Sequence, residues 1–266
     1  MPAHRIMDML KVESVDIMPS QNAAVLTLST GRKYKILLGD YDNLPFTCMN
    51  SSPLENIQID AEKAESTATN RFFDGDCAVF LRFLSRKYSI YSQAMSKVAF
   101  TDMSKKGLYQ KLYYGILQNQ RKPDSKQSVK IEPEELKVLC ELICDEFEEA
   151  GYINDNKYAL ERAKYLKEYK KYGTNRIKDD LYQKGVAKSA IDEALEDEFF
   201  TNEEAEESDA ENMQALLSRK FRSGIDKSDR KEVAKAVNLL SRNGYSYAQA
   251  KKAVTEFIEN QETEDN

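Results

Sequence analysis

The sequence predicts a mainly α-helical fold of tandem three-helix repeats, which form an elongated or curved body behind a small β-rich N-terminal segment. The composition favours helix over sheet, because the 266 residues include no tryptophan, 10 glycines and 6 prolines, with abundant Lys, Glu, Ala and Leu. From Phe72 onward, apolar residues recur at helical spacing. A shift of 59 residues also brings Gly185 onto Gly244 and Leu181 onto Leu240, which indicates an internal repeat.

The β-rich segment and a connector occupy residues 1–70. Short β-favouring runs fill residues 9–38 and are broken by turn residues. We expect a hairpin turn at Ser29–Arg32, because its glycine tolerates the positive φ that such turns require. The connector that follows is rich in Gly, Pro and Ser.

A first helical repeat, diverged and lengthened by an insertion, is predicted for residues 71–150. We expect one helix to end before Ser89, which would cap the next. Residues 101–120 and the segment after Pro133 are also predicted to be helical. The polar residues 119–130 between them favour an exposed loop.

The second three-helix repeat is predicted for residues 151–200. Asn154 or Asp155 is expected to cap its first helix, and Gly173 to end that helix. A second helix then runs to a stop at Gly185, and a third ends in an acidic run. A three-helix unit of this size buries little surface alone, so neighbouring repeats should share apolar faces.

Charge is segregated along the chain, although the net charge is −6. Residues 162–188 hold nine basic side chains against three acidic ones, whereas residues 192–211 hold eleven acids and no base. We interpret residues 201–211 as a flexible acidic linker. The alternatives for the acidic residues 192–211 are mimicry of nucleic acid and binding of a basic partner. Basic residues return at 219–235, within a third repeat predicted for residues 212–266. Two basic patches therefore flank an acidic bridge.

The residues that most enzymes and metal sites need are scarce. Without a secretion signal, the four cysteines are expected to be reduced thiols, and no ligand set for zinc surrounds them (Cys48, Cys77, Cys140 and Cys144). His4 is the only histidine, which excludes a Ser/His/Asp triad. The close acid pairs do not have the pattern of a nuclease site (Asp74 with Asp76, Asp179 with Asp180). We therefore expect no catalysis, no cofactor and no metal.

Neither a membrane span nor an apolar signal core is visible in the sequence. The expected location is the cytoplasm.

The second repeat resembles the RecX family of regulatory proteins, which restrain the RecA recombinase. The residues that carry this likeness are Gly151, Tyr152, Ile153, Asn154, Asp155, Tyr158, Ala159, Gly173, Arg176, Ile177, Leu181, Lys184, Gly185 and Val186. The third repeat continues the pattern with Phe221, Leu239, Leu240, Arg242, Gly244, Tyr245 and Ser246. The likeness covers residues 76–260, and it is interrupted by the insertion near 99–132 and by the acidic residues 203–211.

This resemblance implies a protein without enzymatic activity that binds along the groove of a RecA filament on single-stranded DNA. It implies inhibition of the recombinase and coprotease activities, with single-stranded DNA nearby or weakly bound. We expect a monomer.

The candidate partner-binding residues are the basic side chains of repeats two and three, for which we predict electrostatic docking. In repeat two they are Lys164, Lys167, Lys171, Arg176, Lys178 and Lys184, and in repeat three Arg219, Lys220, Arg222 and Arg230. The alternative for the lysines at 157–171 is a solvated helix face, partly neutralised by Glu161 and Glu168.

Tyrosines form a second flank of the same predicted helix, at Tyr158, Tyr165, Tyr169 and Tyr172. They could stack on bases. We expect instead that the rings pack between repeats with their hydroxyls at the surface.

Two other functions fit the same basic patches. One is direct DNA binding that needs no RecA, which a salt titration would separate from filament binding. The other is a generic helical adaptor for some other protein.

Overall fold

The computed structural model describes residues 12–44, 46–48, 57–59, 77–121 and 130–264. They divide into two units, the first made of the described residues up to 100 together with 109–146, and the second of 101–108 and 147 onward. The prediction of a mainly helical chain behind a small β-rich segment is confirmed.

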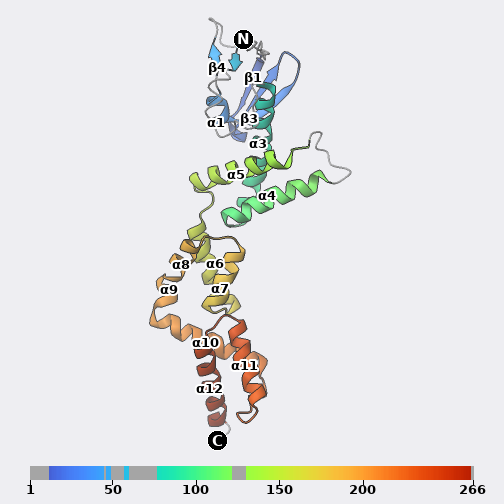
Figure 1. Cartoon of the computed structure of the whole chain (residues 1–266). Helices are drawn as coiled ribbons and strands as arrows, with labels where there is room; N and C mark the ends of the chain where they lie inside the picture. Colours follow the sequence, from blue (N-terminus) through green and yellow to red (C-terminus); the bar gives the residue numbers. More distant parts are fainter. Residues whose placement is uncertain (1–11, 45, 49–56, 60–76, 122–129, 265–266) are drawn as a thin grey trace, which may run out of the picture. The chain divides into compact units, whose positions relative to one another are not determined.

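The first unit begins with an antiparallel sheet in the order β1-β2-β3, seen in blue in Figure 1. Its strands are β1 (Val12–Met18), β2 (Ala23–Leu28) and β3 (Lys33–Leu37), with the short 3-10 helix η1 (Pro19–Gln21) between the first two. The predicted turn at Ser29–Arg32 joins β2 to β3. Helix α1 (Leu38–Asp42) and the antiparallel pair β4 (Phe46–Cys48) and β5 (Ile57–Ile59) follow.

Helix α3 (Cys77–Val98) packs against β3 and covers this sheet. The prediction that one helix ends before Ser89 is wrong, because α3 runs through it without a break. Ser89 lies on the exposed side of α3, whereas Phe80, Leu84 and Ile90 are buried. An apolar stripe that continues past a serine keeps the helix intact, since the cap would gain one hydrogen bond and lose this packing.

The remaining helices of the first predicted repeat are α4 (Lys105–Gln120) and α5 (Pro133–Glu149), as the sequence indicates. The first turn of α4 belongs to the second unit. Most of the predicted polar loop between these helices lies outside the described residues. Buried Leu136, Leu139, Ile143 and Phe147 line one face of α5, at the spacing that the sequence predicts.

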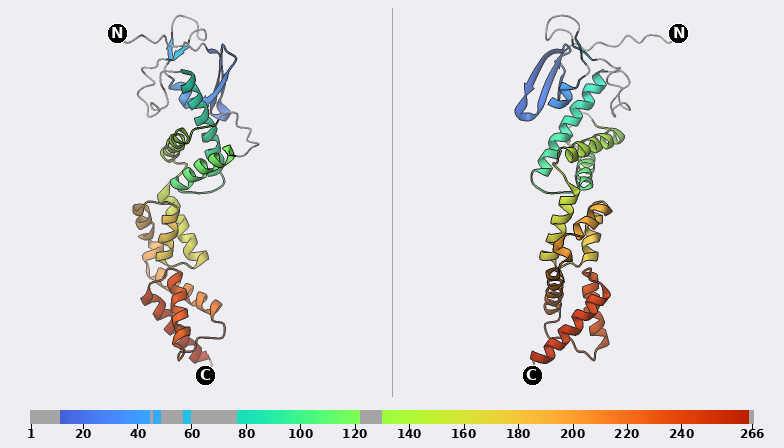
Figure 2. Two further views of the ribbon diagram at one scale, coloured as in Figure 1. Left: turned by 45° about the vertical axis from the view of Figure 1, so that its right-hand side comes forward. Right: turned by 90° about the vertical axis from the view of Figure 1, so that its left-hand side faces the viewer.

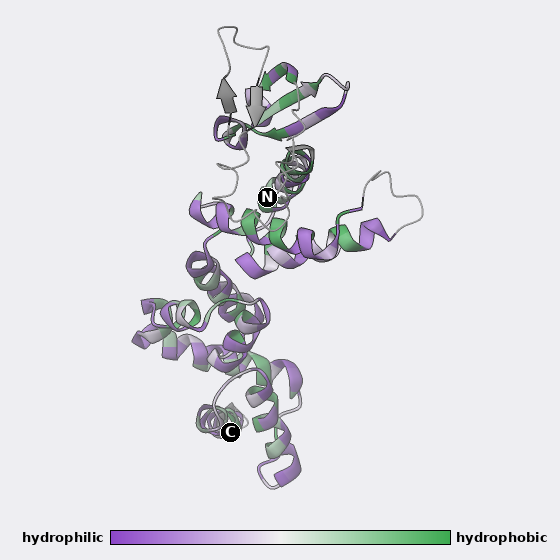
Figure 3. Ribbon diagram, turned by 45° about the horizontal axis from the view of Figure 1, so that its top comes forward, coloured by the Kyte–Doolittle hydropathy of each residue, from purple (hydrophilic) through white to green (hydrophobic). Residues whose placement is uncertain are grey.

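The second unit contains two three-helix repeats, joined by a short helix (Figure 2). Repeat two consists of α6 (Asp155–Lys170), α7 (Thr174–Gln183) and α8 (Lys188–Leu195), and α9 (Glu198–Thr201) follows it. Repeat three consists of α10 (Glu203–Lys220), α11 (Arg230–Arg242) and α12 (Tyr247–Glu264). Each repeat has its own apolar core. Hydrophilic and hydrophobic residues alternate along these helices, as amphipathic helices require (Figure 3).

The predicted cap of α6 is Asn154, whose side chain accepts a hydrogen bond from the Lys157 amide at 2.9 Å. The helix does not end at Gly173, however. Lys171 takes the left-handed conformation that ends it, with φ of 58°, and Gly173 instead precedes α7.

The acidic residues 203–211 differ most from their prediction. They form the first half of α10 rather than a flexible linker, so the first helix of repeat three begins at Glu203 and not near 212. Asn202 caps this helix by accepting from the Ala205 amide. The helix dipole stabilises acidic side chains in the first turn of a helix, and three glutamates lie in the first turn of α10. This interaction favours a helix where composition alone suggests a solvated linker.

Candidate partner-binding surface

Backbone hydrogen bonds connect repeats two and three. The Gly173 amide donates to the Asn243 carbonyl at 2.8 Å, and the Asn175 amide donates to the Gly244 carbonyl at 3.1 Å. The Tyr245 hydroxyl donates to the Lys171 carbonyl at 3.2 Å, and burial raises the pKa of this tyrosine. The N-terminus of α7 is therefore fixed to the turn between α11 and α12.

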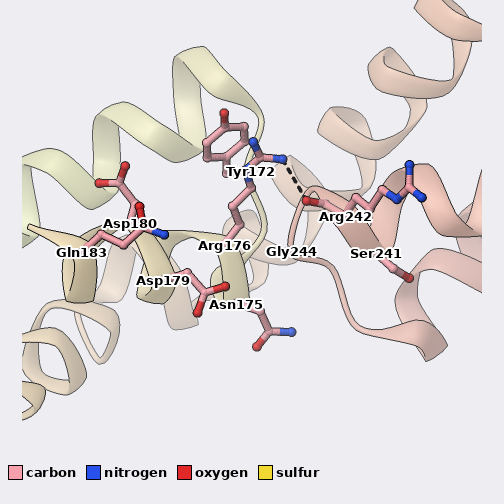
Figure 4. A pocket seen from close by; sticks show the side chains of 9 residues that line it. All are labelled: Tyr172, Asn175, Arg176, Asp179, Asp180, Gln183, Ser241, Arg242 and Gly244. Carbon is pink, nitrogen blue, oxygen red and sulfur yellow. Dashed lines mark hydrogen bonds between the residues drawn. The ribbon is translucent and has the colours of Figure 1, made fainter.

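A groove of about 340 Å³ opens beside this joint (Figure 4). Its walls are more polar than apolar, and they are formed by Tyr172, Asn175, Arg176, Asp179, Asp180, Gln183, Ser241, Arg242 and Gly244. The lining contains both arginines and aspartates, so the groove is not a purely cationic site for phosphate.

Arg176, a predicted contact residue, holds the joint together. Its guanidinium lies 4.0 Å from the centre of the Tyr172 ring and donates to the Arg242 carbonyl at 2.8 Å (Figure 4). Arg242, which is not among the predicted contact residues, has an exposed side chain that lines the groove. The sequence around Arg242, which lies in the last turn of α11, does not indicate that repeat two packs against this turn.

An equivalent joint lies at the other end of repeat two. The Ser104 hydroxyl donates to the Lys184 carbonyl, and the Lys105 amide donates to Asp155 at 2.7 Å. Burial is the largest influence on the Asp155 carboxyl and raises its pKa. The first turn of α4 thus meets the turn between α7 and α8, just as the first turn of α7 meets the turn between α11 and α12.

Lys167 is buried rather than available to a partner. Its side chain is 3% exposed, and its ammonium lies 3.1 Å from an Asp209 carboxylate oxygen. It also donates to the Ala205 carbonyl at 3.0 Å and lies over the Phe199 and Phe200 rings. The acidic start of α10 is therefore held against α6 by an internal cation.

Two further candidates form internal ion pairs. Lys164 lies 3.3 Å from Asp197 and over the Phe199 ring, with about a third of its side chain exposed. Lys178 lies 3.9 Å from Asp192 in an exposed pair, which contributes little to stability.

The other candidates lie at the surface. Lys171 is half-buried. The remaining five candidates are exposed (Lys184, Arg219, Lys220, Arg222 and Arg230). Across the described residues, none of these six side chains forms an ion pair. Arg219 and Lys220 end α10, Arg222 follows at once, and Arg230 begins α11. The structure thus brings four cations of repeat three to one inter-helix connection.

The predicted tyrosine flank of α6 divides into two parts. Tyr158 and Tyr172 are half-buried and pack against the core of repeat two. The expectation of packing between repeats is wrong for Tyr165 and Tyr169, which are 45% and 71% exposed. Their rings stack on each other with centroids 5.2 Å apart.

No group of side chains suited to a metal ion occurs among the residues that the structure describes. Cys140 and Cys144 are buried thiols inside α5 and form no disulfide, and burial raises the pKa of Cys140 to about 12. His4, Asp74, Asp76 and the side chains of Cys48 and Cys77 lie outside the described residues. In the described helices we find none with the length and apolar character to cross a membrane.

The chain is similar to known proteins in sequence and in fold. Residues 154–195 match the family model for the second three-helix domain of RecX. A regulatory protein RecX of Vibrio parahaemolyticus is 34% identical over 107 residues, which are 40% of this chain and 63% of that protein. A regulatory protein RecX of Clostridioides difficile is 25% identical over 144 residues, or 54% of this chain and 65% of that protein. The matches thus span less than two thirds of these relatives.

A crystal structure of regulatory protein RecX has the same fold. It superimposes with a TM-score of 0.60 over 93% of this chain and all of that one, at 16% sequence identity.

Proposed function

The chain is a RecX family protein, and on that premise we propose that it binds RecA filaments on single-stranded DNA and inhibits their recombinase and coprotease activities. It acts in the cytoplasm, as a monomer, by occupying a surface rather than by catalysis, and it needs no cofactor. Single-stranded DNA lies near the bound protein or is weakly bound by it.

The four exposed cations of repeat three support this proposal most directly. We call them the basic connection (Arg219, Lys220, Arg222 and Arg230). The acids beside it are occupied by hydrogen bonds, since Asp229 caps α11 and Glu232 accepts from the Asp226 amide. Asp226 accepts from Ser228, and these hydrogen bonds lower its pKa. Among the described residues none of these acids forms an ion pair with the four cations, whose exposed side chains can attract a negatively charged surface.

Fold stability explains only part of this arrangement. Arg219 and Lys220 lie in the last turn of α10, where the helix dipole favours cations. Arg230 lies in the first turn of α11, where the same dipole disfavours a cation by a few tenths of a kcal/mol to about 1 kcal/mol. A cation at an unfavourable position, without an acidic partner in the described part of the chain, supports a role in binding.

Substitution of the four residues of the basic connection by alanine is expected to weaken inhibition at least tenfold, because the docking charges are lost. The measurement is ATP hydrolysis by RecA filaments preassembled on single-stranded DNA, titrated with each protein. A matched control removes four exposed cations from the first unit (Arg32, Lys33, Lys111 and Lys137), which gives the same change in net charge. The control should inhibit like the unchanged protein.

The unchanged protein should inhibit at a substoichiometric ratio to RecA. Inhibition that begins only when bare DNA is saturated would contradict the proposal and favour direct DNA binding. In that case the affinity for DNA should fall with salt by about 0.7 per neutralised phosphate on a log-log plot.

A further inference from the structure

The acidic run at 192–211 lies against repeat two and meets cations that the sequence predicts as partner contacts. Helix α8 packs along α6, and the run continues through α9 into the start of α10 (Figure 1). Of the six candidate cations of repeat two, three are paired with carboxylates of this run. Half of these cations therefore have an anion that the chain itself supplies.

The contacts follow one face of α6 from its start towards its end. Glu193 accepts a hydrogen bond from the Asn156 side chain at 2.8 Å, in the first turn of the helix. Asp197 meets Lys164 farther along, and the start of α10 meets Lys167 last. The spacing of Asn156, Lys164 and Lys167 places all three on one side of the helix. The run is thus aligned with this face of α6 rather than touching it at a single point.

Two of the three ion pairs lie at the surface, where an outside anion can compete for the lysine. In both pairs each side chain is between 32% and 43% exposed, and the charged atoms are 3.3 and 3.9 Å apart. We call them the screening pairs (Lys164 with Asp197, Lys178 with Asp192). Pairs as exposed as these contribute little to the stability of a fold. The third pair, which Lys167 forms, is buried and holds the run in place.

The screening pairs reduce the attraction of repeat two for phosphate. A phosphate that approaches Lys164 or Lys178 also meets the carboxylate beside the ammonium group, and this repulsion offsets much of the attraction. Exposed lysines without such a neighbour bind nucleic acid of any sequence, because they release its counterions.

We infer that Asp192 and Asp197 determine specificity, by keeping repeat two from binding bare single-stranded DNA. The acidic run then takes the place of phosphates on the cations of its own chain. The inference goes beyond the proposed function, since it concerns DNA without RecA. Under the proposed function, it leaves the filament as the preferred target of the basic connection.

The test is binding of the full chain to a fluorescent oligo-dT strand without RecA, over a range of about 50 to 200 mM salt. The variant Asp192→Asn/Asp197→Asn should bind at least about fivefold more tightly at the lowest salt. Its log-log slope should be steeper by about 1.4, because two more phosphates are neutralised at about 0.7 each. Asparagine keeps the side-chain oxygen with which Asp197 accepts from the Phe199 amide, so circular dichroism should show unchanged helicity.

Two controls identify the cause of the gain. Glu13→Gln/Asp16→Asn removes two exposed carboxylates of β1 and gives the same change in net charge, and it should alter the affinity less than about twofold. Addition of Lys164→Gln/Lys178→Gln to the first variant should return the affinity and the slope to those of the unchanged protein, because the released lysines are then absent.

Three outcomes would overturn the inference. The first is an aspartate variant with the affinity and slope of the unchanged protein, since the screening pairs would then have no effect on DNA. The second is an equal gain in the β1 control, which net charge alone would explain. The third is tight binding that persists without the two lysines, which would place the new contacts on other cations. If the unchanged protein failed to inhibit RecA filaments, the proposed function would fall, and the oligo-dT comparison would still decide this inference.

Discussion

Replacement of Gly173 by alanine is expected to lower the free energy of unfolding by about 2 kcal/mol, the cost of an overpacked contact that cannot relax. A Cβ atom at this position would lie 2.6 Å from the carbonyl carbon of Gly244 and 2.7 Å from the Tyr245 nitrogen. These are backbone atoms, held by the hydrogen bond from the Gly173 amide to Asn243. Because φ at Gly173 is −76°, alanine meets no backbone strain there, and the effect reports the contact alone.

Gly115→Ala is the matched control. This glycine lies inside α4, and a Cβ there would find no atom within 4 Å. The same substitution should therefore raise the free energy of unfolding by about 0.5–1 kcal/mol, through helix propensity. Urea denaturation followed by circular dichroism measures both changes. Equal effects of the two substitutions would show that the joint between repeats two and three is looser than the structure indicates.

The two joints of the second unit follow one rule, which the sequence repeat only partly reveals. Gly185 and Gly244 are related by the 59-residue shift, and both have positive φ, of 79° and 97°. Each lies in the turn after the second helix of its repeat and meets the first turn of the preceding repeat's second helix. The shift predicts the two turns. It could not predict what they contact, because the contacting residues are distant in sequence: Gly173 and Arg176 at Gly244, and the Lys106 side chain at Gly185.

Local signals predicted most of the helices, and tertiary contacts explain the errors. Asn154 was predictable as a cap because its hydrogen bond stays within one turn. Gly173 was assigned to the end of α6 because glycine usually ends helices, whereas its actual role is to leave room for Gly244. Likewise, continued packing against the core, and not local hydrogen bonding, decides that α3 runs through Ser89.

The candidate contact residues show the same difference between what local sequence predicts and what tertiary contacts decide. Sequence spacing placed Lys164, Lys167 and Lys171 on one flank of α6, and charge alone could not distinguish them. Burial distinguishes them, because Lys167 meets Asp209 from the acidic run that was expected to be a linker. The helix found in place of the expected linker thus supplies the carboxylate that pairs with this lysine. Where no such partner comes from elsewhere in the chain, as at Arg219 and Arg222, the side chain is exposed.

Lys167→Met is therefore expected to destabilise the protein by about 3 kcal/mol, without a direct effect on partner binding. The substitution leaves the Asp209 carboxylate, whose side chain is 17% exposed, without its cation, and it leaves the Ala205 carbonyl without its donor. Methionine fills nearly the same volume, so the loss reports the charge rather than a cavity. Thermal and urea unfolding measure the change in stability. ATPase inhibition, measured where the variant is fully folded, should match that of the unchanged protein.

Two further variants separate the buried pair from ordinary surface charge. Lys164→Met breaks the pair with Asp197, in which both side chains are about a third exposed, and should cost less than about 1 kcal/mol. Lys167→Met/Asp209→Asn removes the unpaired carboxylate as well and should recover about 1–2 kcal/mol of the loss, because an uncompensated buried charge is the main penalty. If Lys167→Met were as stable as Lys164→Met but inhibited RecA poorly, Lys167 would be a contact residue after all. The start of α10 would then have to move away from α6 when the partner binds, since only that motion exposes the ammonium group.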